Sequence, residues 1–179
     1  MIKDVLDFWF AEGMEQKWFV KNPEFDREVE EKLFPLYEKA CRDELKEWEA
    51  TAEGCLALCI LWDQVPRNLF RNDPKTFATD TAALKIAQSV VAKGWDKSLT
   101  DYQRVFLYLP FEHSEDLTVQ QTSLDLYRDF GEESNWYDYA LKHEVIVRKF
   151  GRFPHRNEVL GRESTPEEIA FLKQPGSSF

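Results

Sequence analysis

The chain has 179 residues, of which 43% are hydrophobic, and a formal net charge of −10 at neutral pH. This length and composition predict one domain, residues 1–179, with a core large enough to fold without disulfides or metals, and they argue against intrinsic disorder. The negative charge argues against nucleic acids and anionic membrane surfaces as partners, because phosphate groups repel an acidic protein.

The cysteines and the N-terminus indicate a cytoplasmic protein. Three cysteines, Cys41, Cys55 and Cys59, are an odd number without the spacing of a secreted disulfide framework. The first seven residues include acids where a signal peptide needs an apolar stretch. The longest apolar run, residues 55–62, is too short to span a membrane.

Helical periodicity dominates the sequence from end to end. The expected helices, in chain order, are residues 5–9, 25–36 with a continuation towards Leu45, 52–62, 82–92, 100–108, 117–130, 135–150 and 167–173. Glycines at positions 94, 131 and 151 are expected to end three of them. Thr165, Pro166 and Glu168 have the pattern of a capping box, which predicts where the last helix begins.

Three prolines interrupt these patterns. Pro35 is expected to kink or split its helix, Pro66 to end the central apolar helix, and Pro110 to interrupt the helix that begins after Thr100. No segment alternates with period two over a useful length, so we expect no β-sheet. The predicted fold is all-α, with antiparallel helical hairpins joined by short loops.

The first motif with chemical potential follows the central helix. Asp63 falls on the same face as Leu56 and Cys59, which predicts a buried carboxylate. Because an unpaired buried charge is costly, Arg67 or Arg71 is expected to pair with it. The same residues are also consistent with a salt bridge that clamps the helix end, with Asn68 capping the turn.

A second motif, residues 150–157, repeats the pattern of a proline followed by Arg-Asn. It lies within the most basic part of the chain, residues 142–162, whose cations are Lys142, Arg148, Lys149, Arg152, Arg156 and Arg162 against Glu144 and Glu158. Guanidinium groups bind carboxylates and phosphates through two parallel hydrogen bonds. These arginines therefore indicate either an anion site or internal pairing with the abundant Asp and Glu.

The histidines are the candidates for acid–base chemistry. His143 lies at the centre of an apolar helix face, which suits a core histidine or a general base in a pocket. His113 follows Pro110 in a segment that could equally be a capping turn. The spacing of His113, His143 and His155 is unlike that of zinc enzymes, and there is no glycine-rich phosphate loop, so we expect neither a metal nor a cofactor.

Several of these segments together resemble a bacterial family of unknown function, number 924 among such domains. The resemblance extends over residues 5–10, 18–19, 63–71, 77–80, 108–115, 150–157 and 164–168. Trp62 and Val65 depart from the usual pattern, and position 112 is expected to vary. It implies a tetratricopeptide-like array of helical hairpins and no established activity. The recurring positions that it implies are Asp63, Gln64, Arg67, Asn68, Arg71, His113, Ser114, His143, Arg148, Arg152, His155, Arg156 and Asn157.

These observations lead to one hypothesis about function and one alternative. The hypothesis is a pocket at helix ends that binds a small anionic metabolite, with His143 and His113 as donors or catalysts. Its predicted ligand-binding residues are Asp63, Gln64, Arg67, Asn68, Arg71, Arg148, Arg152, His155, Arg156 and Asn157. The alternative is a tetratricopeptide-like module that binds a protein partner, in which the Arg and Asp motifs form a structural ion-pair network. Whether a reaction follows binding is left open.

Overall fold

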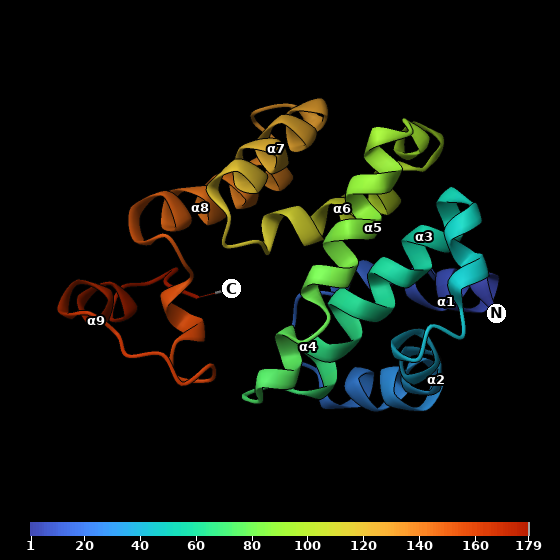
Figure 1. Ribbon diagram of the computed structural model, residues 1–179, viewed down its shortest axis with the longest axis horizontal. Helices are drawn as coiled ribbons and strands as arrows, with labels where there is room; N and C mark the ends of the chain where they lie inside the picture. Colours follow the sequence, from blue (N-terminus) through green and yellow to red (C-terminus); the bar gives the residue numbers. More distant parts are fainter. Residues whose placement is uncertain (179) are drawn as a thin grey trace. The chain divides into compact units, whose positions relative to one another are not determined.

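The computed structural model describes residues 1–178, and within that range it contains helices and no strand (Figure 1). The α-helices are α1 (Ile2–Trp9), α2 (Pro23–Cys41), α3 (Ala52–Cys59), α4 (Val65–Leu69), α5 (Asp80–Ala92), α6 (Asp101–Glu112), α7 (Leu117–Tyr127), α8 (Asn135–Phe150) and α9 (Pro166–Leu172). The prediction of an all-α fold is confirmed, whereas the tetratricopeptide-like arrangement stays a prediction. No helix in this range is both long and apolar enough to cross a membrane.

The chain forms two compact units. The first comprises residues 1–71 and 75–110, and in it α3 packs against α1 and α5 while α2 packs against α4. The second comprises residues 72–74 and the chain from Phe111 onward, and in it α7 packs against α8 and α9 against the 3-10 turn Pro154–Arg156. Each unit has buried apolar residues of its own; those of the second include Ile146, Val147 and Phe153.

The helix α2 is continuous through Pro35. It begins at Asn22, whose side-chain oxygen accepts hydrogen bonds from the backbone N–H groups of Glu24 and Phe25 at 3.0 and 3.1 Å. Pro35 was expected to kink or split this segment, and splitting is wrong because the helix continues to Cys41. Pro35 and the residue four positions before it, Glu31, are both exposed, so water can bond to the carbonyl that proline leaves without a donor.

The expectation that Pro66 ends the central helix is also wrong. After α3 the chain makes a π-helical turn, Ile60–Gln64, and continues as α4 with Pro66 in its first turn. Proline has no N–H to donate, so its place in a continuous helix leaves the carbonyl four residues earlier without its usual donor. The carbonyl of Trp62, four residues before Pro66, instead accepts the hydroxyl of Thr79 at 2.5 Å.

Pro110 does not interrupt α6, contrary to expectation. The helix extends to Glu112, and the side chains of Phe111 and Glu112 are buried. Burial of a phenylalanine side chain contributes about 2–3 kcal/mol, which offsets much of the cost of a proline inside a helix. The helix therefore ends about one turn later than predicted, at Glu112 and not at residue 108.

The other helix ends follow the sequence closely. Gly94 and Gly151 adopt left-handed φ angles of +69° after α5 and α8. This is the conformation that favours glycine at a helix C-terminus. The predicted capping box is confirmed, because Thr165 and Glu168 exchange side-chain to backbone hydrogen bonds at 3.2 and 2.8 Å.

Gly54 marks the closest backbone approach in the first unit. A Cβ atom at this position of α3 would lie 2.0 Å from the carbonyl oxygen of Trp48. Alanine normally stabilises a helix by about 1 kcal/mol relative to glycine. Here we expect Gly54→Ala to destabilise the protein by about 2 kcal/mol net, because the clash involves backbone that cannot rotate away. Urea denaturation checks this, with the exposed neighbour Glu53→Ala as the control; a gain in stability on Gly54→Ala would contradict the close packing.

Candidate functional site

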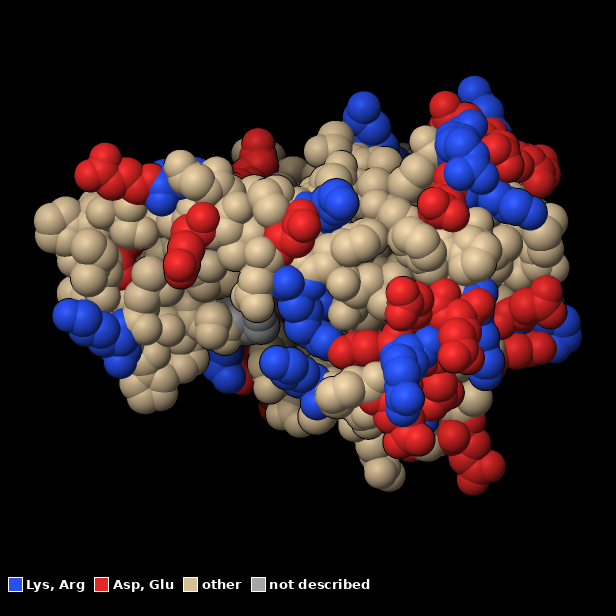
Figure 2. Space-filling model, turned by 90° about the horizontal axis from the view of Figure 1, so that it is seen from below, with Lys and Arg blue, Asp and Glu red and all other residues tan. Residues whose placement is uncertain are grey.

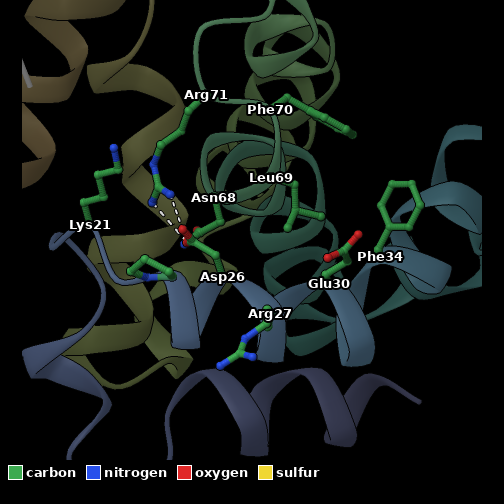
Figure 3. A pocket seen from close by; sticks show the side chains of 10 residues that line it. Lys21, Asp26, Arg27, Glu30, Phe34, Asn68, Leu69, Phe70 and Arg71 are labelled. Atoms are coloured by element: carbon green, nitrogen blue, oxygen red, sulfur yellow. Dashed lines mark hydrogen bonds and ion pairs between the residues drawn. The ribbon is translucent and has the colours of Figure 1, made fainter.

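The first unit contains a pocket of about 410 Å³ that opens to solvent between α2 and the end of α4 (Figure 3). Two short stretches of sequence far apart in the chain contribute its walls. The residues that line it are Lys21, Pro23, Asp26, Arg27, Glu30, Phe34, Asn68, Leu69, Phe70 and Arg71. Asn68 and Arg71 come from the first predicted motif, so the sequence identified one wall of this pocket.

Asp26 joins the two walls. Its carboxylate accepts hydrogen bonds from the Asn68 amide at 2.9 Å and from both terminal nitrogens of Arg71, Nη2 at 3.1 Å. Asn68 is buried, whereas one third of the Arg71 side chain is exposed. The charge of Asp26 is thus balanced within the protein, and Arg71 keeps a free surface towards the pocket.

Charged and apolar side chains are ordered along the pocket. Figure 3 shows Lys21 on the same side as Arg71, Glu30 one helical turn beyond Asp26, and Phe34 near Glu30. The rings of Phe34 and Phe70 pack edge to face, with centroids 6.1 Å apart. Among residues 1–178, neither Lys21 nor Glu30 forms an ion pair, so both remain available to a ligand.

Asp63, the buried carboxylate of the first motif, pairs with Arg67. Its side chain is 1% exposed, lies 3.3 Å from Arg67 Nη1 and accepts a hydrogen bond from Gln64 at 2.6 Å. Arg67 also donates to the backbone carbonyl of Asp63 at 2.7 Å and to both carboxylate oxygens of Asp80 at 2.8 and 2.9 Å. Of the two arginines expected as partners, the structure therefore brings Arg67 to Asp63, whereas Arg71 pairs with Asp26.

Arg152 of the second motif and Arg148, which precedes the motif in α8, also have internal carboxylate partners. Arg152 donates to both oxygens of Glu168, at 2.7 and 2.9 Å, and Arg148 pairs with Glu144 one turn earlier in α8. The Asn157 amide donates to the same Glu168 carboxylate at 3.3 Å. These bonds, led by the one from Arg152, lower the pKa of Glu168 to about 2.

His143 is buried and held by its own helix. Its Nδ1 lies 2.8 Å from the carbonyl oxygen of Tyr139 and 3.1 Å from a carboxylate oxygen of buried Glu112. A carbonyl oxygen only accepts, so Nδ1 carries the proton. Burial, followed by repulsion from His113, Arg156 and His155, lowers the pKa of His143 to about 3, and the imidazole is neutral at physiological pH.

The other members of the second motif gather around Phe153. Its ring lies 5.6 Å from the rings of His143 and His155, and the Arg156 guanidinium stacks 4.6 Å from its centroid. Arg156 also donates to the backbone carbonyl of His113 at 2.9 Å. The structure thus brings His113, His143, His155 and Arg156 together in the second unit. Residues 1–178 contain no group of three or more His, Cys, Asp or Glu positioned to hold a metal ion.

Comparison with known proteins identifies the family of the chain. A family model described as bacterial protein of unknown function, DUF924, matches residues 5–176. The chain belongs to the DUF924 family. It is similar to a solved structure from Agrobacterium tumefaciens, the protein of unknown function ATU0120, with 41% sequence identity, a TM-score of 0.91 and 96% of each chain covered. No curated protein matches.

Half of the pocket lining of this DUF924 member was not predicted from the sequence. Lys21, Asp26, Glu30 and Phe34 lie in an acidic, amphipathic stretch that has the composition of an ordinary surface helix. The available signal was their spacing, since residues 26, 30 and 34 recur every four positions and form one stripe along α2. Glu112 was also given no role, and it proves to be the buried carboxylate beside His143.

Proposed function

We propose that this DUF924 protein binds a small metabolite with one carboxylate group in the pocket between α2 and α4. The observation that carries the proposal is the pairing of two accessible cations, Lys21 and Arg71, with an apolar wall in one pocket. Small-molecule sites commonly combine apolar walls with a few polar groups that orient the ligand. The volume of about 410 Å³ suits a metabolite of moderate size.

The internal pairing of Arg71 prepares it for this role. Asp26 and Asn68 hold the guanidinium group and the helix end in place, so binding does not have to order a flexible side chain. Lys21 is exposed and adds a second charge on the same side of the pocket. A carboxylate between them would accept hydrogen bonds from two cationic donors, the stronger class of hydrogen bond in proteins.

The surroundings of the pocket favour a small ligand over a polyanion. Figure 2 views the side on which α2 lies, and acidic side chains gather there with basic ones between them. Within α2 the acids are Glu24, Asp26, Glu28, Glu30, Glu31 and Glu38, against Arg27, Lys32 and Lys39. Such a surface repels nucleic acid and weakens the attraction for multiply charged phosphates. One carboxylate group of a small ligand can instead lie beside the two cations Lys21 and Arg71.

For the Arg and Asp pairs of both motifs we propose a structural role, as in the alternative reading of the sequence. Arg67, Arg152 and Arg162 each bind a carboxylate through two nitrogens, and each pair joins segments distant in the chain. None of these three arginines lines the pocket, whereas Arg71 lines it and keeps one third of its side chain exposed although it too binds a carboxylate through two nitrogens. The ligand-binding role is therefore assigned to Lys21 and Arg71, with Asn68 holding Asp26 in place, and not to the whole set of predicted residues.

Replacing Lys21 by glutamine tests the proposed function. We expect wild-type protein to bind 3-phenylpropionate with a dissociation constant below about 10 mM, and Lys21→Gln to weaken binding about threefold to tenfold, because an exposed charged contact contributes on the order of 1 kcal/mol. Titration calorimetry measures both, with Lys46→Gln, an exposed lysine outside the pocket, as the matched control. Lys21 forms no ion pair within residues 1–178, so the variant should fold normally. Absence of binding by the wild type, or equal affinity of the variant, would overturn the proposal.

A further inference from the structure

We infer that the pocket between α2 and α4 takes a zwitterion, an α-amino acid with an apolar side chain. The inference rests on the proposed function and names its ligand class. Three features of the pocket carry it: the accessible cations Lys21 and Arg71 on one side, the carboxylate of Glu30, and the aromatic rings of Phe34 and Phe70.

The order of these groups follows from the helix. Asp26, Glu30 and Phe34 are spaced by four residues, so each lies about 6 Å further along the same face of α2. Arg71 is bound at the level of Asp26, one turn before Glu30, and Phe34 follows one turn later. The carboxylate, the ammonium group and the side chain of an α-amino acid diverge from one carbon atom, so a ligand seated beside Glu30 can direct each of them to a different part of this stripe. The carboxylate would then meet Arg71 and Lys21, the ammonium Glu30, and the apolar side chain Phe34 with Leu69.

The pocket offers both signs of charge, which favours a zwitterion over a plain anion. Asp26 and Arg71 compensate one another, and Arg27 also lines the pocket but points away from Asn68 and Leu69 in Figure 3. Of the other two charged lining residues, Lys21 is positive and Glu30 negative, and neither forms an ion pair within residues 1–178. A ligand with only a carboxylate would leave the negative charge of Glu30 without a positive partner. A ligand with only an amine would leave the positive charge of Lys21 without a negative partner. Only a ligand with both charges satisfies both residues.

Glu30 is accordingly the residue that decides selectivity. It lies on the exposed surface of α2 and no described contact ties it to the fold, so its replacement changes the pocket and little else. Its neighbour Glu31 is equally exposed, belongs to the same helix and lies outside the pocket lining. Glu30→Gln and Glu31→Gln are therefore a matched pair with the same change in net charge.

Three related probes test the two charges of the ligand one at a time. They are L-phenylalanine, 3-phenylpropionate, which lacks the ammonium group, and 2-phenylethylamine, which lacks the carboxylate. Titration calorimetry of the wild type should show L-phenylalanine binding at least about fivefold more tightly than either analogue, since each exposed charge contact contributes on the order of 1 kcal/mol. Glu30→Gln should reduce the preference for L-phenylalanine over 3-phenylpropionate to below about twofold, while Glu31→Gln leaves it unchanged.

The possible failures are distinguishable. Equal or tighter binding of 3-phenylpropionate by the wild type, or an unchanged preference in Glu30→Gln, overturns the zwitterion and leaves the carboxylate pocket standing if Lys21→Gln still weakens binding. Tightest binding of 2-phenylethylamine overturns both, because the cations would then play no part. Absence of binding for all three probes also overturns both.

Discussion

Replacing Arg67 by alanine is expected to lower the free energy of unfolding by about 3 kcal/mol, because the change leaves the carboxylate of Asp63, 1% exposed, without its nearest cation. The loss has a second source in the backbone. Arg67 donates to the Asp63 carbonyl at the end of the π-helical turn, where the regular helical hydrogen-bond pattern is broken. The substitution also removes the hydrogen bonds from Arg67 to the two carboxylate oxygens of Asp80, at 2.8 and 2.9 Å. Few single changes in the first unit remove so many contacts at once.

Urea denaturation followed by circular dichroism measures this loss. Arg42→Ala is the matched control, since Arg42 and Glu44 form an ion pair with both side chains about half exposed, and such pairs contribute about 0–1 kcal/mol. Arg67→Lys should recover only part of the stability, because an ammonium group cannot bond both oxygens of Asp80 in the guanidinium geometry. If Arg67→Ala unfolded at nearly the wild-type urea concentration, the pair would not be structural, and a ligand-binding role for Arg67 would regain weight.

The helices could be predicted from the sequence because their signals are local. Apolar residues at intervals of three and four, the glycines at 94 and 151 and the capping box at Thr165 all act within a few residues of the element that they define. The prolines were misjudged because their effect depends on what lies nearby in space. Pro66 is tolerated because Thr79, thirteen residues later, donates to the carbonyl that lost its partner.

The candidate site, too, could be predicted from the sequence only where local geometry decides it. The burial of Asp63 follows from its position on the face of Leu56 and Cys59, which helical geometry alone provides. The partner of each arginine does not follow, since several acids compete in a chain with 33 Asp and Glu residues. Arg71 binds a carboxylate 45 positions earlier, which only tertiary packing decides. For the same reason the four-residue spacing of residues 26, 30 and 34 could be read from the sequence, but their place in a pocket with residues 68–71 could not.

The ion pair of Arg152 with Glu168 is expected to make the second unit sensitive to acid. Glu168 is 3% exposed, and its pKa of about 2 lies below the value of 4.5 for a free glutamate. Between these two values the unfolded chain binds a proton that the folded chain does not, so stability falls as the pH falls from about 4.5 towards 2. The stabilisation present above pH 4.5 amounts to at most about 3 kcal/mol by this linkage.

Arg152→Ala should abolish most of that stabilisation at neutral pH and flatten the acid limb of the stability profile. The reason is that Glu168 then titrates nearer its value in the unfolded chain, although its bonds to Asn157 and to the Thr165 N–H remain. Urea denaturation at a series of pH values from 7 down to 2.5 measures both effects. Lys149→Ala removes the corresponding pair with Glu167, in which both side chains are at least half exposed, and should leave the profile unchanged. A parallel downward shift of the whole curve in Arg152→Ala, with the slope below pH 4.5 intact, would show that the acid sensitivity originates in another carboxylate.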